Sequence, residues 1–274
     1  MSPDYEGLIM KTKCLAVVNQ KGGVGKSTVA VHVVYAAREA GLNVLLVDLD
    51  RQGSSSITFL PEGGSTDALT SSALFQTESA WAAETRQAEI VDKGFGIVRA
   101  DVALATIGEV TKDELKKVAA RIKSLASHYD LCVLDTPGSI GLNPAMTPAA
   151  LTAADAVICP FNIGLYEGQA LADLWEYLKR IKSQGYNPKL RLLGLLPSKI
   201  NTKSKEEREA LAQLREHFGS AIMPHMLAER VAVKQSIMRR KPVWYATRGA
   251  GHAAAKQEWR EATTAILNEL GVMR

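Results

Sequence analysis

The chain has 274 residues, of which 46% are hydrophobic and 23% are charged, and its formal net charge is +4. This composition indicates a globular protein that can bury a full core, and it excludes a chain kept disordered by a shortage of apolar residues. No run of about 18 uncharged apolar residues occurs, and the first residues lack the basic and apolar pattern of an export signal, so we expect a cytoplasmic protein without a membrane partner.

We expect residues 1–12 to form a flexible polar leader and residues 13–274 to form a single domain, because no linker composition interrupts the rest of the chain. The cysteines Cys14, Cys132 and Cys159 each lie in an apolar run typical of a buried strand, and no two of them have a CxxC spacing. They are therefore interpreted as core thiols rather than as ligands of a metal or a cluster.

An apolar run predicts a strand over 13–19, which is followed by a glycine-rich stretch and then by a helix that ends at Gly41. The glycines free the backbone to curl so that successive N–H groups point into one cavity, and the helix start adds its positive end. A turn that binds nothing is the alternative, which the order strand, loop, helix disfavours. Within the stretch, Lys26 is expected to meet the β- and γ-phosphates of a nucleotide, and the Ser27 hydroxyl is expected to ligate magnesium. The predicted phosphate-binding residues are Gly22, Gly23, Val24, Gly25, Lys26, Ser27 and Thr28.

The loop departs from the strict phosphate-loop pattern, which has glycine at the position of Gln20. Lys21, immediately before the double glycine, marks the deviant form of the motif, and through it the chain resembles the ParA/MinD family of dimeric ATPases. The resemblance is closest to the ParA branch, to IncC-like plasmid partition proteins that lack an N-terminal helix-turn-helix domain, since Gln20 suits that branch and the first strand begins at about residue 13. In that family the extra lysine reaches across the dimer to the partner's nucleotide, which implies a catalytic role for Lys21 beside Lys26.

A continuously apolar run at 43–50 predicts a parallel strand buried on both faces, and it contains Asp48 and Asp50. Because side chains two residues apart on a strand point to the same side, we expect these carboxylates to share a face. The segment resembles the family's DxDPQG motif, with Arg51 in place of the proline. The resemblance implies that Asp50 orients the attacking water and senses magnesium, and that Asp48 is a supporting carboxylate near the metal. The alternative, that both aspartates only cap the next helix, stays open.

The stretch 53–94 carries the least information. Its glycine- and serine-rich parts are typical of loops, and helical patterns are predicted around 66–74 and 80–91. A buried strand is predicted at 95–100. The helical period of Leu115, Val118, Ile122 and Leu125 predicts a helix at 111–127.

The next predicted strand, 130–135, ends in Asp135. An apolar strand ending in aspartate is the Walker B arrangement, in which the carboxylate holds the water shell of Mg²⁺. Together with the resemblance, this implies a metal site made by Ser27, Asp48, Asp50 and Asp135. The family usually has a second proline after this strand, where this chain has Gly138, and we expect the glycine to soften the switch that reports the γ-phosphate.

Residues 149–160 and 166–168 also resemble the family, but a structural role is favoured for them, with Asp155 turning the chain into the next strand. A surface helix is predicted at 171–181, a strand at 190–197 and an amphipathic helix at 203–218. The loop after this late strand contains Asn201, which the resemblance makes the candidate to face adenine.

The window from Ala228 to Arg260 has a net charge of +6, so the rest of the chain sums to −2. We expect a helix at 227–238 and a closing helix at 253–270. Two interpretations of the window remain open: the basic residues stabilise the C-terminus of a helix, or they contact DNA phosphates without sequence preference. The basic residues of the window are Arg230, Lys234, Arg239, Arg240, Lys241, Arg248, Lys256 and Arg260, and the DNA-binding candidates among them are Lys234, Arg239, Arg240 and Lys241.

The alternation of strands and helices predicts a doubly wound α/β domain with a mostly parallel sheet of about seven strands and helices on both faces. The resemblance implies a P-loop NTPase that binds ATP and Mg²⁺, forms an ATP-dependent homodimer and attaches to non-specific DNA of the nucleoid. It further implies weak hydrolysis that DNA and a centromere-binding, ParB-like partner stimulate, so that plasmid or chromosomal DNA is segregated. Two alternatives remain: a related ATPase that positions another cargo, such as a conjugation or cell-pole complex, and an ATP-regulated binding module with negligible turnover.

Overall fold

The computed structural model describes residues 12–139, 144–164, 167–245 and 249–273. Residues 1–11 of the predicted leader, Tyr166 and Arg248 therefore lie outside the described residues. Thr12, placed in the leader by the sequence, belongs to the domain, because its hydroxyl donates hydrogen bonds to the carbonyls of Ala126 (3.1 Å) and Tyr129 (2.7 Å).

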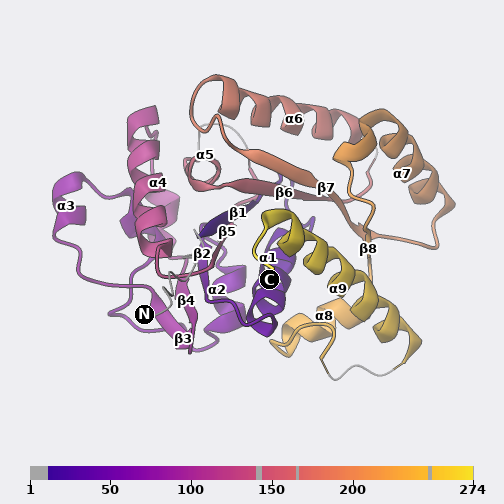
Figure 1. The fold of residues 1–274 in the computed structure, drawn as a ribbon, viewed down its shortest axis with the longest axis horizontal. Coiled ribbons are helices and arrows are strands. Elements are labelled where there is room, and N and C mark those ends of the chain that lie inside the picture. The colour runs from indigo at the N-terminus through magenta and orange to yellow at the C-terminus, as the bar shows by residue number, and fades with distance from the viewer. Residues whose placement is uncertain (1–11, 140–143, 165–166, 246–248, 274) are drawn as a thin grey trace, which may run out of the picture.

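A sheet forms the centre of the molecule, and its described part has eight strands in the order β3-β4-β2-β5-β1-β6-β7-β8 (Figure 1). All neighbouring strands are parallel except β3, which runs antiparallel to β4 at one edge. The prediction of a doubly wound, mostly parallel sheet is confirmed, and β3 and the two-residue β8 are additions to the strands predicted. The strands are β1 (Lys13–Val17), β2 (Val44–Asp48), β3 (Glu89–Asp92), β4 (Phe95–Val98), β5 (Leu131–Asp135), β6 (Ala156–Phe161), β7 (Arg191–Ile200) and β8 (Leu227–Ala228).

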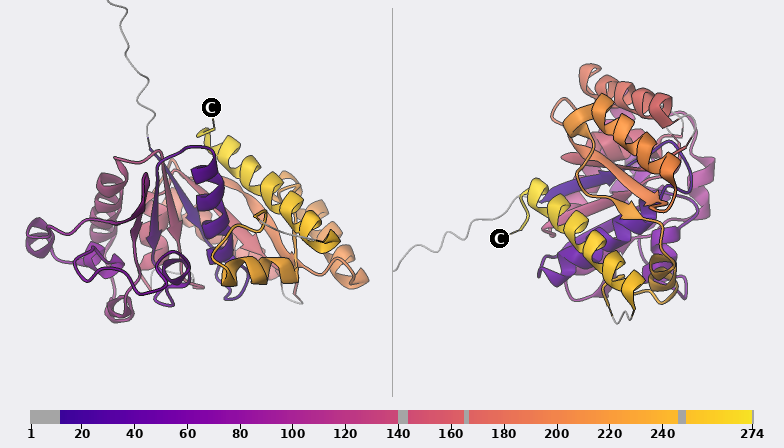
Figure 2. Two further views of the ribbon diagram at one scale, coloured as in Figure 1. Left: turned by 90° about the horizontal axis from the view of Figure 1, so that it is seen from below. Right: turned by 90° about the vertical axis from the view of Figure 1, so that its right-hand side faces the viewer.

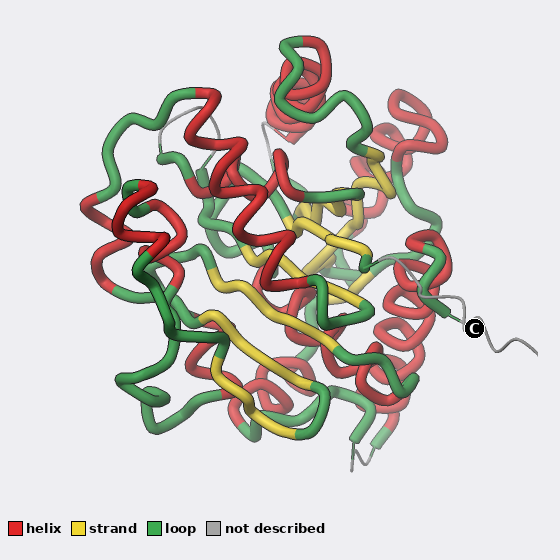
Figure 3. The backbone as a smooth tube through the Cα atoms, turned by 60° about the vertical axis from the view of Figure 1, so that its left-hand side comes forward, coloured by secondary structure: helices red, strands yellow, loops and turns green. Residues whose placement is uncertain are grey.

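Helices cover both faces of this sheet, as Figure 3 shows. No helix in the described parts of the chain is both long and apolar enough to cross a membrane. The α-helices are α1 (Lys26–Glu39), α2 (Ser54–Phe59), α3 (Glu78–Ala82), α4 (Lys112–Ala126), α5 (Met146–Ala153), α6 (Glu167–Ser183), α7 (Lys205–Phe218), α8 (Val231–Met238) and α9 (Ala250–Leu270), and the 3₁₀ turns are η1 (Ser71–Phe75), η2 (Val102–Thr106) and η3 (Gly219–Ala221).

The helical patterns predicted in the least informative stretch are largely wrong. Of the predicted helix at 80–91, only the short α3 forms, and residues 89–92 instead make the edge strand β3. Residues of β3 are alternately half-buried and exposed, the period-two pattern of a strand with one solvated face, and Ile90 is 67% exposed. Pairing with β4 therefore decides the structure of this segment. The helix predicted at 227–238 likewise begins as β8, and α8 starts only at Val231.

The sheet is buried on both faces because its strands alternate between two hydrophobic layers. In β1, Cys14 and Ala16 point into the layer under α4, α5 and α6, whereas Leu15 and Val17 point into the layer under α1 and α9. Figure 2 shows α9 lying beside α1 on the second face. All three cysteines are buried and free, as predicted. This double burial explains why the central strands are continuously apolar.

A fully buried histidine joins α1 to the chain beyond α8. The Nδ1 of His32 lies 2.8 Å from the carbonyl of Thr28, and its Nε2 accepts a hydrogen bond from the backbone N–H of Val243 (3.2 Å). Its ring packs on Trp259, with the ring centroids 4.1 Å apart. Burial lowers the pKa of His32 to about 4, so the ring is neutral at pH 7 and can accept from Val243.

Lowering the pH is expected to destabilise the protein through His32. The unfolded chain protonates a histidine below about pH 6.5, whereas the folded chain does so only near pH 4. The unfolded state therefore binds more protons in between, and the free energy of unfolding falls by about 2 kcal/mol from pH 7 to pH 5. Urea unfolding at both pH values measures this loss. His32→Gln should lose less unfolding free energy than the wild type. The control His217→Gln, which changes an exposed histidine, should lose as much as the wild type. Equal losses in the wild type and both variants would contradict the assignment.

Candidate functional site

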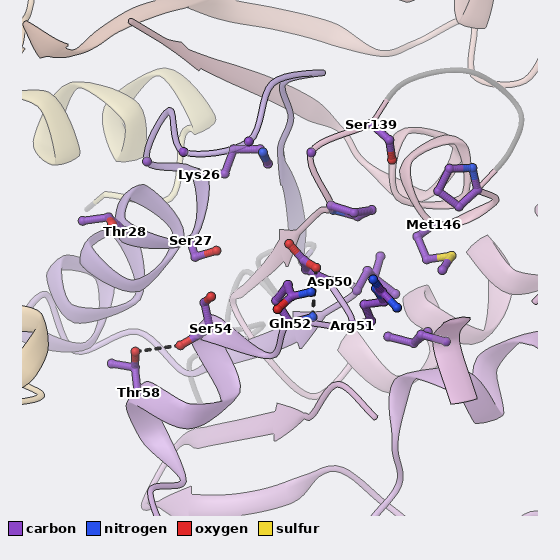
Figure 4. Close-up of a pocket in the computed structure, with 18 of the residues that line it drawn as sticks. Lys26, Ser27, Thr28, Asp50, Arg51, Gln52, Ser54, Thr58, Ser139 and Met146 are labelled. Carbon is purple, nitrogen blue, oxygen red and sulfur yellow. Dashed lines mark hydrogen bonds between the residues drawn. The ribbon is translucent and has the colours of Figure 1, made fainter. Parts of the chain in front are cut away.

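A cavity of about 830 Å³ opens at the carboxyl ends of the parallel strands. At this edge the chain leaves β1, which lies between β5 and β6. The strand order reverses here, and doubly wound sheets bind ligands at such a point. Lys26 and Ser27 lie on one side of this main cavity, facing Asp50, Arg51 and Gln52 (Figure 4). The remaining lining residues come from the same loop and α1, from the chain after β2 and α2, from η2 and the chain after it, from the chain after β5 and α5, from β7 and from α8. They are Gly22, Gly23, Gly25, Thr28, Leu49, Ser54, Thr58, Leu104, Ala105, Ile107, Pro137, Gly138, Ser139, Pro144, Met146, Lys199 and Ile237.

The loop between β1 and α1 has the backbone shape that an anion site requires. Gly23 (φ 77°) and Gly25 (φ 97°) both adopt the left-handed conformation that glycine permits without strain. Gly25 is the N-cap of α1 and provides no side-chain acceptor, so no cap side chain binds the first N–H groups of this helix. N–H groups that no cap side chain binds, together with the positive end of the helix, suit a phosphate ligand.

Lys26, the first residue of α1, is held against the loop that precedes it. Its side-chain Nζ donates to the carbonyl of Lys21 (2.9 Å), and the residue is only 6% exposed. Burial lowers the pKa of Lys26, and the charges of Asp135 and Asp50 oppose that shift. An anion in the main cavity would therefore give this ammonium a stronger partner than a carbonyl.

Lys21, the lysine before the double glycine, is bound within its own chain. Its Nζ lies 2.6 Å from Oε2 of Glu167, the first residue of α6, and Lys21 does not line the main cavity. Glu167 is 2% exposed, and its Oε1 has no hydrogen-bond partner in the described residues. Burial raises the pKa of Glu167, and Lys21 lowers it. Sequence reasoning missed Glu167, because the stretch that contains it was assigned a structural role.

The structure separates Asp48, the last residue of β2, from Asp50, which follows the strand. The strand ends at Asp48, so Asp50 lies beyond it, and the two side chains no longer share a face. Asp50 lines the main cavity, whereas Asp48 is buried behind it. Asp48 accepts hydrogen bonds on Oδ2 from the backbone N–H (2.8 Å) and the hydroxyl (2.7 Å) of Ser56, and on Oδ1 from the N–H of Asp50 (3.1 Å). Asp48 therefore anchors the start of α2 and positions Asp50.

Asp135 is fully buried at the end of β5, directly beside Asp48 in the sheet register. Its Oδ2 accepts from the hydroxyl of Ser55 (2.5 Å), and its Oδ1 has no hydrogen-bond partner among the described residues. Burial raises the pKa of Asp135 to about 6, opposed by the hydroxyls of Ser55 and Ser27 and by the charge of Lys26. Burial and the neighbouring Asp135 raise the pKa of Asp48 to about 7.

The residues around Asp135 fit a magnesium ion that is bound together with phosphates. Asp135 offers a buried oxygen that no described residue binds, Ser27 lies beside it, and Asp50 faces the same cavity. The described residues contain no group of three or more His, Cys, Asp or Glu side chains that could hold a metal alone. Mg²⁺ is usually bound by one or two carboxylates, by waters and by phosphate oxygens, which matches this partial set.

Two departures from the family pattern have structural reasons. A Cβ on Gly138 would lie 3.0 Å from the backbone nitrogen of Gly22, so the chain after β5 packs directly against the phosphate loop and leaves no room for a proline. The Gln20 amide donates to the carbonyl of Ala170 in α6 (2.8 Å), which ties the loop to that helix. Neither contact is visible in the sequence, because each joins residues far apart along the chain.

A side cavity of about 280 Å³ adjoins the main one. Lys199 lines both cavities, but sequence reasoning gave it no role. Asn201, predicted to face adenine, lines neither: its side chain accepts a hydrogen bond from the N–H of Lys203 (3.1 Å), and its own N–H donates to Glu207 (2.8 Å). The residues around the side cavity are Gly25, Thr28, Ser198, Lys199, Leu227, Ala228, Glu229, Arg230, Val233, Lys234, Ile237 and Trp259.

Residues 239–241, which we call the basic segment, are exposed directly after α8. The last carbonyls of α8 accept from the backbone N–H groups of these three residues, and no described side chain of the segment caps the helix. This observation favours an open basic surface over helix-terminus stabilisation. In the segment, Arg240 donates to the carbonyl of Ile57 in α2 (3.4 Å), and Lys241 lies over the ring of Tyr245. Lys234 on α8 pairs with Glu229 (3.1 Å).

Comparisons with known proteins agree with this geometry. A family model described as an AAA domain matches residues 12–192. The chain is 32% identical over 230 residues to the chromosome-partitioning ATPase Soj of Thermus thermophilus, covering 82% of this chain and 85% of Soj. It is 29% identical over 257 residues to a protein IncC of Escherichia coli, covering 91% of this chain and 67% of IncC, so it spans about two thirds of the length of that relative. Cobyrinic acid a,c-diamide synthase from Mycobacterium smegmatis with bound ADP and magnesium has a similar structure, with a TM-score of 0.70, 25% identity and coverage of 96% and 97% of the two chains.

Asp135→Asn is expected to stabilise the protein without nucleotide at pH 8 and to abolish the further stabilisation that ATP with Mg²⁺ provides. Because the folded pKa is raised from 3.8 to about 6, the stability due to Asp135 is present at low pH and lost as the pH rises through that range. The neutral asparagine avoids the buried charge and can still accept from Ser55. Thermal unfolding at pH 5 and pH 8 tests this, because a change of 1 kcal/mol in the free energy of unfolding shifts the melting temperature by roughly 2–4 °C.

The gain from Asp135→Asn should shrink at pH 5, where the wild-type carboxyl is largely protonated. Asp155→Asn is the matched control, because Asp155 accepts from the N–H of Cys14 (2.8 Å) away from the cavities. A full Mg²⁺-dependent shift in Asp135→Asn would contradict the placement of the metal.

Proposed function

Because the chain belongs to the AAA domain family of ParA-like ATPases and is an ATP hydrolase that uses Mg²⁺, we propose that it is a partition ATPase. In this proposal it dimerises on ATP, attaches to DNA without sequence preference and is reset by hydrolysis, so that plasmid or chromosomal DNA is segregated. The observation that carries the proposal is that the basic segment contacts α2 through Arg240, and that the chain just after it contacts α1 through Val243. The similarity to Soj and IncC supports the same reading.

The phosphates of ATP are proposed to lie against the loop between β1 and α1. Backbone N–H groups of residues 22–28 bind their oxygens, and Lys26 exchanges the carbonyl of Lys21 for the β- and γ-phosphates. Ser27 and Asp135 would hold Mg²⁺ and its waters, and the ion would supply positive charge beside the phosphates. Asp50, held by Asp48, orients the attacking water. Positioning and charge therefore account for the catalysis, with little covalent chemistry left to the protein.

Lys21 is proposed to act across an ATP-dependent homodimer. In the single chain its ammonium is bound to Glu167, so dimerisation has to release it. Removing the cation from a carboxylate that is 2% exposed is costly, because a buried charge then lacks its partner. Contacts from the second subunit and attraction to its nucleotide have to offset that cost. The ion pair thus favours the single chain until ATP is present in both sites.

DNA is proposed to bind along Lys234 and the basic segment. The chain just after the segment donates to His32 of α1 through the N–H of Val243, and Arg240 binds the carbonyl of Ile57 in α2. Because α1 begins at the phosphate loop and α2 begins just after Asp50, a rearrangement of these loops on nucleotide exchange reaches the segment. This attachment gives the DNA surface a route by which it senses the nucleotide.

A centromere-binding, ParB-like protein is the proposed partner that stimulates hydrolysis, and the nucleoid within the cytoplasm is the proposed location. Both rest on the similarity to partition proteins. ATP turnover measured alone, with non-specific DNA and with such a partner tests them. Stimulation by DNA and partner together is expected. Turnover that neither changes would favour the alternative of an ATP-regulated binding module.

Asp50→Ala is expected to lower ATP turnover by at least about tenfold while ATP binding is retained, because water positioning is lost and the phosphate loop is intact. Single-turnover hydrolysis and equilibrium ATP binding measure the two effects. Asp67→Ala removes an exposed carboxylate that lines neither cavity and should leave both values unchanged. Normal turnover in Asp50→Ala would exclude the assigned role.

The double variant Arg239→Glu, Arg240→Glu is expected to weaken ATP-dependent binding to non-specific DNA and to reduce the slope of log K against log salt by about two, one for each lost phosphate contact. DNA titrations at several salt concentrations measure the slope. The control variant, Lys179→Glu with Lys182→Glu, makes the same charge change on α6, on the other face of the sheet. It should weaken DNA binding and reduce the slope less. An unchanged slope in the Arg239 and Arg240 variant would place the DNA surface elsewhere.

A further inference from the structure

Lys199 has a backbone conformation that ordinary side chains rarely adopt. It lies near the end of β7 with φ 55°, in the left-handed region that favours glycine. The register between β7 and β8 shifts between Ser198 and Ile200, so Lys199 occupies a bulge. Such strain is retained where the surrounding structure holds the residue in place, and it concentrates at functional sites.

The side chain of Lys199 extends from this bulge across the phosphate loop. Its Nζ donates a hydrogen bond to the carbonyl of Gly23. A Cβ added to Gly25 would lie 3.7 Å from Cε of Lys199 and 3.0 Å from the hydroxyl of Ser198, so the loop and the end of β7 are in close contact. Lys199 lines both the main cavity and the side cavity.

The bond to Gly23 orients one peptide group of the loop. A trans peptide is planar, so its carbonyl and the following N–H point in opposite directions. When Lys199 draws the Gly23 carbonyl outwards, the N–H of Val24 points to the other side of that peptide. Lys26 holds the carbonyl of Lys21 in a similar way. Two lysines thus bind carbonyls of the same loop, and its N–H groups are left for an anion.

We propose that Lys199 is a nucleotide-positioning residue, which fixes the phosphate loop through Gly23 and separates a phosphate subsite in the main cavity from a base subsite in the side cavity. The ligand is a nucleoside di- or triphosphate. The inference rests on ATP binding at this loop, as in the proposed function. The size of the side cavity, about 280 Å³, and its position beside Gly25 and Thr28 suit a ligand part attached to phosphates in the main cavity.

A purely structural role for Lys199 makes a different prediction. The lysine is exposed in the protein without nucleotide, and a single exposed hydrogen bond adds little to the stability of the fold. A positioning residue should therefore affect nucleotide affinity and leave the stability of the empty protein nearly unchanged. A structural residue should lower that stability first.

The test compares three substitutions at Lys199 with one nearby control. Lys199→Met keeps the length of the stem and removes the ammonium, Lys199→Arg keeps a donor, and Lys199→Gly removes the side chain and relieves the left-handed backbone. Lys203→Met is the control, because Lys203 is exposed in the following loop and lines neither cavity. Equilibrium titration with ADP and with ATP, each with Mg²⁺, and thermal unfolding without nucleotide are measured for every protein.

Lys199→Met and Lys199→Gly are expected to weaken binding of both nucleotides by roughly tenfold or more, the effect of losing a hydrogen bond from a charged group. Lys199→Arg should recover part of the affinity. The melting temperature without nucleotide should stay unchanged in Lys199→Met and should be equal or higher in Lys199→Gly. The control should match the wild type in both measurements.

Two results would overturn the inference. One is wild-type nucleotide affinity in Lys199→Met and Lys199→Gly, and the other is a marked loss of stability in Lys199→Met without nucleotide. If the wild-type protein itself binds neither ADP nor ATP, the proposed function fails as a whole. If the wild type binds them and the variants bind equally well, only the role of Lys199 fails.

Discussion

The rest of the structure depends on how the carbonyl groups of the loop between β1 and α1 are bound. A loop can present several N–H groups to one anion only when the carbonyls of the same peptides are satisfied elsewhere. Lys26 binds the carbonyl of Lys21, and Lys199 binds that of Gly23. At the entrance, Asn19 donates to the carbonyl of Pro160 (2.7 Å) and accepts from the N–H of Lys21 (2.9 Å). These contacts come from the chain itself, so the shape of the loop does not rest on a nucleotide, and less ordering of the backbone is added to the cost of binding.

This preparation places charged groups where water does not reach them. Asp48 and Asp135 are buried side by side with raised pKa values, and Lys26 is buried with a lowered one. Glu167 retains an oxygen that has no hydrogen-bond partner among the described residues. Each of these groups destabilises the empty protein relative to an uncharged residue of the same shape. Phosphates would bring the charge opposite to Lys26, and Mg²⁺ the charge opposite to Asp135, so these two groups favour the loaded state. A site of this kind is stabilised by its ligand more than by its own contacts.

The sequence predicted the parts of the site whose signal is local. The order of strand, glycine-rich loop and helix located residues 22–28, and the apolar strand ending in Asp135 was found in the same way. The prediction that Asp48 and Asp50 lie on one strand was wrong, because β2 ends at Asp48 and the period-two argument holds only within a strand. Glu167 and Lys199 were missed because they reach the loop only through the sheet order, which places β6 next to β1 and β7 next to β6. Their contacts to the loop join residues 146 and 176 positions apart. The helix expected at 80–91 failed because pairing with β4 decided that segment.

The same sheet order explains how events at the loop reach a surface that does not contact it directly. The helices α1 and α2 leave the two loops that face the main cavity, and each carries a contact to the chain around the basic segment: His32 accepts from Val243, and the carbonyl of Ile57 accepts from Arg240. Farther along α1, Glu39 accepts from the indole N–H of Trp244 (2.6 Å) and pairs with Arg260 of α9 (3.1 Å). Because a packed interior transmits a displacement rather than absorbing it, a shift of α1 relative to α2 cannot leave all of these contacts in place. In the proposed function, the segment then follows one helix or the other, and this movement links the nucleotide to the exposed basic surface.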